Sequence, residues 1–157
     1  MKKYNSVFVQ GNVLAKQRKF DEAIACFDEA LELNPKHVGA LYSKGHALAK
    51  QGKLGEAFKC YDLAVEIEPN KTLALSNKAL ILEDNNRLDE AMGYWEQVLE
   101  IDATDFLALY GKAEILHKQG KLVEAIKGYD EILKIKNYED EELTLRSRKR
   151  ALKELTN

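Results

Sequence analysis

Apolar residues recur along the chain at intervals of three and four positions, in short stripes separated by polar turns. Residues 38–71 give the clearest case, with a first stripe at Leu41, Gly45 and Leu48 and a second at Ala57, Tyr61 and Ala64. Spacing of this kind places each stripe on one face of an α-helix. A turn at residues 51–54 separates the two stripes. The pattern therefore predicts a hairpin of two helices.

This hairpin pattern recurs with a period of 34 residues. An alanine marks the second helix of each unit, and an aromatic residue follows that alanine four positions later. The alanines are Ala23, Ala57, Ala91 and Ala125, and the aromatic residues are Phe27, Tyr61, Trp95 and Tyr129. A constant period of this length indicates a repeat array, in which each unit packs mainly on its neighbours. We expect one array over residues 1–157, with repeats at 4–37, 38–71, 72–105 and 106–139.

The repeats closely resemble those of the tetratricopeptide repeat (TPR) family, whose 34-residue unit carries large apolar, small and proline residues at fixed places. The second repeat has them as Leu41, Gly45, Leu48, Ala57, Tyr61, Ala64 and Pro69, and the first as Val7, Gly11, Leu14, Ala23, Phe27, Ala30 and Pro35. The later repeats drift, with Val98 and Ile132 in place of the second alanine and Ala103 and Asn137 in place of the proline. The resemblance implies an all-α fold, a right-handed superhelix (α-solenoid) of four helical hairpins.

Residues 140–155 resemble the solvating helix that usually caps such an array. Acidic residues stand at its start and basic residues toward its end, which is the order that the helix dipole favours. The apolar residues available to cover the last hairpin are Leu143, Leu145, Ala151, Leu152 and Leu155. Alternatively, the basic run at 146–150 contacts an anion or RNA, although acids and bases balance over residues 139–157.

Composition agrees with a helical protein of the cytoplasm. The chain is 45% hydrophobic and 32% charged, with a formal net charge of -2, whereas binding to nucleic-acid phosphates needs clustered basic residues. No apolar run approaches the roughly 18 residues of a membrane span, and no apolar signal core precedes the first repeat. Cys26 and Cys60 occupy equivalent places in successive repeats, too far apart for a disulfide, and are expected to be reduced.

Residue constellations typical of enzymes are absent. The three histidines, His37, His46 and His117, form no metal-binding pair and accompany no recognisable nucleophile. Carboxylates recur at one place in each second helix, at Asp28, Asp62, Glu96 and Asp130. Such regularity is typical of a repeated solvated face rather than of one catalytic acid pair. We therefore expect neither catalysis nor a metal or other cofactor.

In TPR proteins, one face of each first helix lines a concave groove that receives an extended peptide or a helix. The resemblance places ten candidate binding residues on this face: Phe8, Asn12, Tyr42, His46, Leu73, Asn77, Leu80, Leu107, Tyr110 and Glu114. The positions at the rim of the groove are Lys16, Lys50, Asp84 and Lys118. Aromatic side chains dominate interface hot spots, so we expect Phe8, Tyr42 and Tyr110 to anchor the ligand.

The first helix of the third repeat is apolar on nearly every side between residues 73 and 82. Leu82 is expected to point inward, Leu73 and Leu80 toward the groove, and Ile81 toward a neighbouring repeat. A helix that is apolar all round is normally buried. Either neighbouring repeats cover Leu73 and Leu80, or these two residues form an apolar floor for a partner.

Some TPR proteins hold the terminal carboxylate of heat-shock chaperones in a clamp of lysine, asparagine and arginine. The corresponding places in repeats one to three hold Phe8, Asn12, Ser43, Leu73 and Asn77, and those in repeats two to four hold Tyr42, His46, Asn77, Leu107 and Gly111. Neither set contains a basic residue. We therefore expect no chaperone carboxylate clamp and a ligand that is apolar or aromatic in part.

The sequence thus predicts a non-catalytic scaffold or adaptor that binds a protein or peptide in its groove. Two alternatives stay open. One is a nucleic-acid-binding module that uses the basic turns, at Arg18, Lys19, Lys53, Arg87 and Lys121. The other is a self-assembling structural element, in which the first repeat or exposed leucines join two chains.

Overall fold

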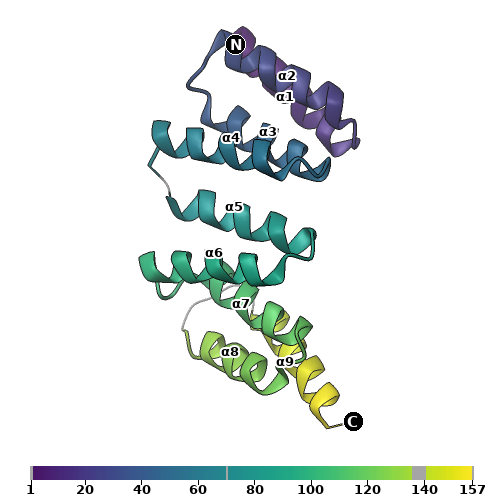
Figure 1. The fold of residues 1–157 in the computed structure, drawn as a ribbon, viewed down its shortest axis with the longest axis vertical. Coiled ribbons are helices and arrows are strands. Elements are labelled where there is room, and N and C mark those ends of the chain that lie inside the picture. Colours follow the sequence, from purple (N-terminus) through teal and green to yellow (C-terminus); the bar gives the residue numbers. More distant parts are fainter. Residues whose placement is uncertain (1, 70, 136–140, 157) are drawn as a thin grey trace. The chain divides into compact units, whose positions relative to one another are not determined.

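The computed structural model describes residues 2–69, 71–135 and 141–156. Within these residues the chain forms nine α-helices and no strand (Figure 1). They are α1 (Lys3–Lys16), α2 (Phe20–Leu33), α3 (Val38–Lys50), α4 (Leu54–Ile67), α5 (Lys71–Asp84), α6 (Leu88–Ile101), α7 (Phe106–Lys118), α8 (Leu122–Lys134) and α9 (Glu141–Leu155). The all-α fold expected from the sequence is confirmed, and the first eight helices fall two to each 34-residue repeat.

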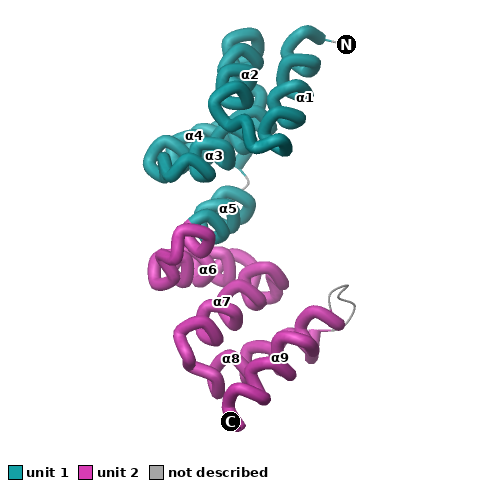
Figure 2. Tube along the Cα trace, turned by 90° about the vertical axis from the view of Figure 1, so that its right-hand side faces the viewer, with its two compact units in different colours: residues 1–81 teal, residues 82–157 magenta. Residues whose placement is uncertain are grey.

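The chain divides into two compact units, residues 1–81 and residues 82–157 (Figure 2). In the first unit, α1 packs on α2, α2 on α3, and α3 on α4. In the second unit, α6 packs on α7, α7 on α8, and α8 on α9. Consecutive helices therefore lie side by side within each unit, as expected for stacked hairpins. None of the helices in the described part of the chain combines the length and apolar composition that crossing a membrane requires.

The turn inside each hairpin contains one residue in the left-handed backbone region. These residues, Arg18, Gly52, Asn86 and Gly120, have φ angles of 62°, 79°, 58° and 75° and lie one repeat apart. In each case the following backbone N–H donates to a carbonyl near the end of the first helix, as from Lys53 to Leu48 at 3.0 Å. This bond closes the helix end in the Schellman arrangement. Glycine suits the left-handed position and asparagine tolerates it, whereas Arg18 is strained there.

The aromatic residue of each second helix is fully buried. Phe27, Tyr61, Trp95 and Tyr129 are all 0% exposed. Close approach of the paired helices explains why the facing residue is small, because a Cβ atom on Gly45 would lie 2.5 Å from Cε1 of Tyr61. Such a contact is far inside van der Waals distance. The period of alanines and aromatic residues in the sequence is therefore the period of the core.

The C-terminal helix α9 packs on α8 through its small residues. Thr144, Ser147 and Ala151 are buried, whereas Leu143, Leu145 and Leu155 are exposed. The prediction that these three leucines cover the last hairpin was wrong, because the helix turns its small-residue face inward. The helix was predicted from residue 140, which lies outside the described residues, as do Asn137 and Glu139.

The three arginines of α9 pair with acids of the same chain. Arg148 Nε lies 2.5 Å from Oδ1 of Asp130 on α8, and Arg146 Nη2 lies 2.9 Å from Oε1 of Glu142. An arginine held by a neighbouring carboxylate is less available to an outside anion. The structure thus favours the capping interpretation of this segment over contact with an anion or RNA.

Candidate functional site

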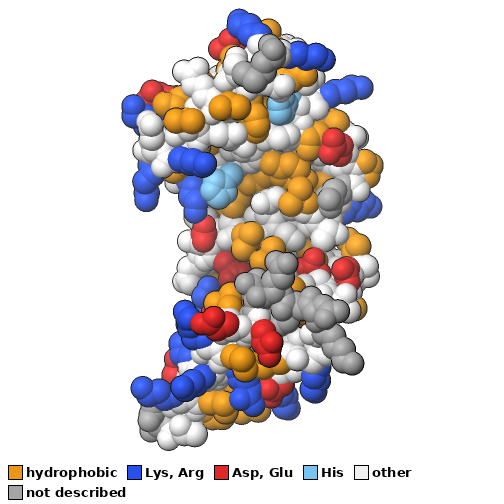
Figure 3. All heavy atoms as spheres, turned by 180° about the vertical axis from the view of Figure 1, so that it is seen from behind, with side chains coloured by type: hydrophobic (Ala, Val, Ile, Leu, Met, Phe, Trp, Pro, Cys, Tyr) orange, Lys and Arg blue, Asp and Glu red, His pale blue; other side chains and the backbone are white. Residues whose placement is uncertain are grey.

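A hollow of about 680 Å³ opens in the first unit, lined by residues of α1, α3 and α5 among others. Four of the ten predicted binding residues line it: Asn12, Tyr42, His46 and Asn77. The lining also includes three cations, Lys16, Arg18 and Lys50. In the upper half of Figure 3, where this unit lies, histidine and basic side chains border an apolar area. The spacing of first-helix residues in the sequence therefore places these four side chains around one cavity.

Tyr42 lines this hollow and also a second one of about 410 Å³. Its ring stacks on the buried ring of Tyr61, with centroids 5.6 Å apart and planes at 28°. Burial raises the pKa of the Tyr42 hydroxyl, and the charge of Glu68 adds to the effect. The hydroxyl oxygen is buried and has no hydrogen-bond partner within the described residues.

The second hollow brings a further predicted residue, Leu73, next to Tyr42. Leu73 is 45% exposed and Leu80 is 41% exposed, so neighbouring helices leave much of both side chains uncovered. Leu82 and Ile81 are buried, at 0% and 4%. The apolar character of α5 is thus divided between a buried side and an exposed side.

Phe8 packs against other aromatic rings of the first unit. Its ring packs 4.6 Å from the ring of His37 and 6.0 Å from that of Phe27, measured between centroids. Phe8 does not line either hollow, but it lies against Gly39, which lines the second. Phe8 therefore packs behind one residue of the second hollow without lining it.

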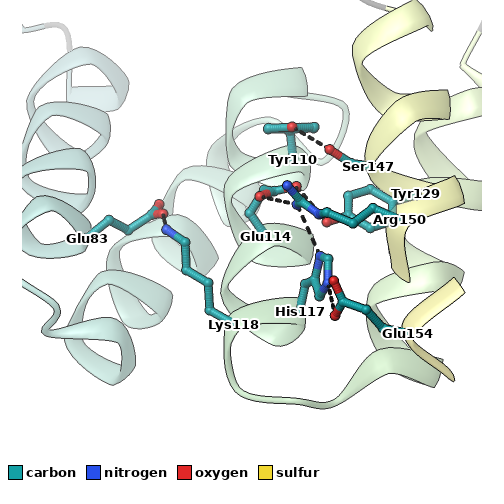
Figure 4. Close-up of polar contacts among 9 residues, drawn as sticks. All are labelled: Glu83, Tyr110, Glu114, His117, Lys118, Tyr129, Ser147, Arg150 and Glu154. Atoms are coloured by element: carbon teal, nitrogen blue, oxygen red, sulfur yellow. Dashed lines mark hydrogen bonds and ion pairs between the residues drawn. The ribbon is translucent and has the colours of Figure 1, made fainter. Parts of the chain in front are cut away.

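In the second unit, the predicted residues Tyr110 and Glu114 face the C-terminal helix (Figure 4). The Tyr110 hydroxyl lies 2.9 Å from Oγ of Ser147. Glu114 accepts a hydrogen bond of 2.7 Å from the Tyr129 hydroxyl, and its Oε2 lies 3.0 Å from Nη2 of Arg150. These side chains therefore bind their own chain. Leu107, on the same helix α7, is 41% exposed.

Two further residues extend this network. Nη2 of Arg150 lies 3.1 Å from Nδ1 of His117, and Nε2 of His117 lies 2.7 Å from Oε2 of Glu154. An arginine can only donate, so Nδ1 accepts and the ring proton sits on Nε2, from which it is donated to Glu154. The network fixes α9 to α7 through a chain of matched donors and acceptors.

The charge state of Glu114 follows from these partners. Burial alone would raise the pKa of its carboxyl group. Hydrogen bonds from Tyr129 and Ser147, together with the charge of Arg150, outweigh burial and lower the pKa below its ordinary value. Glu114 is therefore an ionised acceptor that stabilises the second unit.

The sequence did not reveal the contacts that α9 makes with the predicted groove residues. Ser147, Arg150 and Glu154 are far from α7 in sequence and lie outside the 34-residue pattern. The available signal was the density of arginine in the tail, which indicated acidic partners without naming them. Among the described residues, no group of three or more His, Cys, Asp and Glu side chains could hold a metal ion.

The family model described as tetratricopeptide repeat matches residues 8–72 and 76–140. The chain belongs to the TPR family. Each match spans two of the four hairpins found in the sequence and the structure. A comparison with curated proteins found no match.

Two solved TPR structures resemble the chain. The first TPR of Spaghetti (RPAP3), bound to the HSP90 peptide SRMEEVD, is 26% identical with a TM-score of 0.60, over 75% of this chain and 94% of that one. YrrB, described as a TPR protein with an unusual peptide-binding site, is 20% identical with a TM-score of 0.57, over 81% of this chain and 66% of that one. The likeness to YrrB shows the fold alone. TPR hairpins are protein-interaction modules, and the chain has their fold.

Proposed function

We propose that this TPR protein is a non-catalytic scaffold or adaptor, and that its first unit binds a segment of another protein along the groove face of α1, α3 and α5. The observation that carries the proposal is the 680 Å³ hollow, whose lining includes Asn12, Tyr42, His46 and Asn77. The similar RPAP3 repeat holds a peptide, which supports a peptide or helix as the ligand here.

The lining suits recognition of a polypeptide. Tyr42 supplies aromatic contact area, which contributes strongly to interface affinity. Asn77 is held in place because its Nδ2 donates a 2.9 Å hydrogen bond to the carbonyl of Leu73. Asn12 and His46 add groups that can pair with a peptide backbone or side chain. The site therefore offers one large apolar contact surrounded by hydrogen-bonding groups.

The residues at the predicted site bear on which class of protein partner is proposed. The places of the chaperone carboxylate clamp hold no basic residue, so a clamp of that type is not proposed. The cytoplasmic location, the absence of a cofactor and the use of Phe8, Leu80, Leu107 and Tyr110 by a ligand stay predictions.

Nucleic-acid binding along the basic turns is a weaker proposal. Lys19 Nζ lies 3.9 Å from Oε1 of Glu22, and Arg87 Nη2 lies 2.6 Å from Oε2 of Glu90. Cations that already face a carboxylate gain less from a phosphate. Self-association through exposed leucines stays the third possibility and is tested by sedimentation at several protein concentrations.

The test of the main proposal is a selection of phage-displayed random octapeptides on the full chain, followed by fluorescence anisotropy with the selected peptides. Tyr42→Ala should weaken binding by about 10-fold or more, because it removes the aromatic contact between the two hollows. Leu63→Ala is the control, since Leu63 on α4 is 48% exposed and lines neither of these hollows. Circular dichroism checks that both variants fold.

Equal binding by wild type and Tyr42→Ala would overturn the proposal. The same measurement with Tyr110→Ala examines the second unit, where release of α9 has to be separated from loss of a ligand contact. Tyr110→Phe makes that separation, because it removes the hydrogen bond with Ser147 and keeps the ring.

A further inference from the structure

The hollow of the first unit is basic on one side. Lys16, Arg18 and Lys50 line it, and none of the described residues in its lining is acidic. We propose that this hollow binds carboxylate groups, so that the ligand is a peptide segment with acidic residues beside an apolar or aromatic one. The inference rests on the proposed peptide-binding function and specifies the chemistry of the ligand.

Two of these cations have no carboxylate of their own. Within residues 2–69, 71–135 and 141–156, Lys16 and Arg18 form no ion pair and no side-chain hydrogen bond. Elsewhere in the same unit, Lys44 Nζ lies 2.5 Å from Oδ1 of Asp28. An outside carboxylate would give Lys16 and Arg18 the charge-assisted hydrogen bonds that Lys44 already makes.

Arg18 also adopts a backbone conformation that is unfavourable for a residue other than glycine. Its φ of 62° lies in the left-handed region, and the equivalent turn residues of the second and fourth repeats are Gly52 and Gly120. A non-glycine side chain costs free energy in this conformation. Backbone strain that glycine would relieve is often found at functional sites. Here the strained residue contributes a guanidinium group to the lining of the hollow.

Stabilisation of helix ends explains only part of the gathering of basic residues at the hollow. Lys16 and Lys50 lie in the last turns of α1 and α3, where the helix dipole favours cations. The dipole does not account for Arg18, which stands beyond the helix in the turn. It also does not account for the absence of acids from the lining.

The position of Tyr42 determines which part of the ligand would lie in each hollow. It lines the basic hollow and also the second hollow, which contains Leu73. Carboxylates would therefore lie toward the turn after α1, and an apolar or aromatic side chain would lie between Tyr42 and Leu73. The cations that carry this site are not at the places of the chaperone clamp, which hold Phe8 and Leu73 instead of bases.

A peptide fits this site better than a nucleic acid. Affinity for nucleic acid comes from many phosphate contacts along an extended basic surface. Here Lys16, Arg18 and Lys50 gather at one hollow, and the neighbouring Lys19 already faces Glu22. In the second hollow, Val38 and Leu73 lie with Tyr42 among polar residues and offer a place for an apolar side chain, which a phosphate backbone lacks.

The test compares the composition of octapeptides selected from the random phage library by three forms of the full chain. They are the wild type, a control variant and Lys16→Ala/Arg18→Gly, in which glycine relieves the left-handed turn. Lys19→Ala/Lys53→Ala is the matched control, because it also removes two charges at hairpin turns and neither residue lines the hollow. A fluorescein-labelled 20-nucleotide single-stranded DNA is titrated in parallel.

We expect the wild type and the control to enrich peptides with Asp or Glu near an aromatic or leucine residue. For those peptides, Lys16→Ala/Arg18→Gly should weaken binding by about 10-fold or more, and added salt should weaken the wild-type complex. Enriched peptides without acids would overturn this inference and leave the proposed function standing. No enrichment by any form would overturn both, and DNA that binds more tightly than the peptides and depends on Lys16 and Arg18 would show a nucleic-acid site.

Discussion

The same positions of the repeat carry different chemistry in the two units. Asn12, His46, Leu80 and Glu114 follow one another at intervals of one repeat, the first three in the first unit and Glu114 in the second. Asn12 and His46 line an open hollow, whereas Glu114 is bound by Tyr129 and by Arg150 of α9. The face predicted to bind a ligand can therefore be open in one unit and filled by contacts within the chain in the other.

The two units also differ in how their buried aromatic side chains are hydrogen-bonded. In the second unit, the Trp95 indole donates to Glu83 at 2.8 Å and the Tyr129 hydroxyl donates to Glu114 at 2.7 Å. In the first unit, the Tyr61 hydroxyl is buried without a hydrogen-bond partner in the described part of the chain. In the second unit, carboxylates accept hydrogen bonds from the buried aromatic side chains. The buried hydroxyl of Tyr61 in the first unit has no such acceptor among the described residues.

The largest expected effect comes from removing the acid of the second unit. Glu114→Ala should lower the free energy of unfolding by about 2 kcal/mol, because it leaves the Tyr129 hydroxyl without an acceptor and releases Arg150. The corresponding change His46→Ala, at an exposed position, should stay within about 0.5 kcal/mol. Urea unfolding followed by circular dichroism measures both.

The pH dependence of unfolding gives an independent check on Glu114. The folded state lowers the pKa of this group, so its contribution is present above the ordinary glutamate pKa of about 4.3 and is lost as the pH falls further. Glu114→Ala should therefore lose less stability on acidification than the wild type. An equal loss in both would contradict the proposed role of the network.

The next effect compares one substitution at two equivalent positions. Tyr129→Phe should destabilise the protein by about 1.5 kcal/mol, because it removes a hydrogen bond to a charged acceptor. Tyr61→Phe should instead stabilise it by up to about 1 kcal/mol, because it removes a buried hydroxyl without a partner. Thermal and urea unfolding of the two variants measure the signs, and the same sign for both would contradict the comparison.

The smallest effect concerns the strained turn of the first unit. Arg18→Gly should raise stability by about 0.5 kcal/mol, because relief of the left-handed conformation exceeds the added flexibility of the unfolded chain. Gly52→Ala, the opposite change at the equivalent turn, should lower stability by about 1 kcal/mol. A loss of stability in Arg18→Gly would show that the arginine stabilises the turn through contacts of its own.

The sequence predicted the hairpins because their cause is local and repeated. The alanine and aromatic at one place in every repeat, such as Ala57 and Tyr61, specify helix pairing and core in each unit alike. The groove positions could be named from the same period. The sequence could not show whether a predicted groove position is open, because this depends on contacts outside the repeat pattern. The contact between Glu114 and Arg150 is an example: the two residues are 36 positions apart, and the contact occurs in one repeat only.

By itself, the sequence determined the helices, their pairing in 34-residue hairpins and the family of the chain, since each repeat carries the same local instructions for packing. Only the tertiary structure decided that α9 turns its small residues inward, that Glu114 becomes a half-buried acceptor, and that Lys16 and Arg18 line a hollow without acids. The physical reason is that charge pairing and burial depend on which distant side chains meet. A period in the sequence describes only what every repeat has in common.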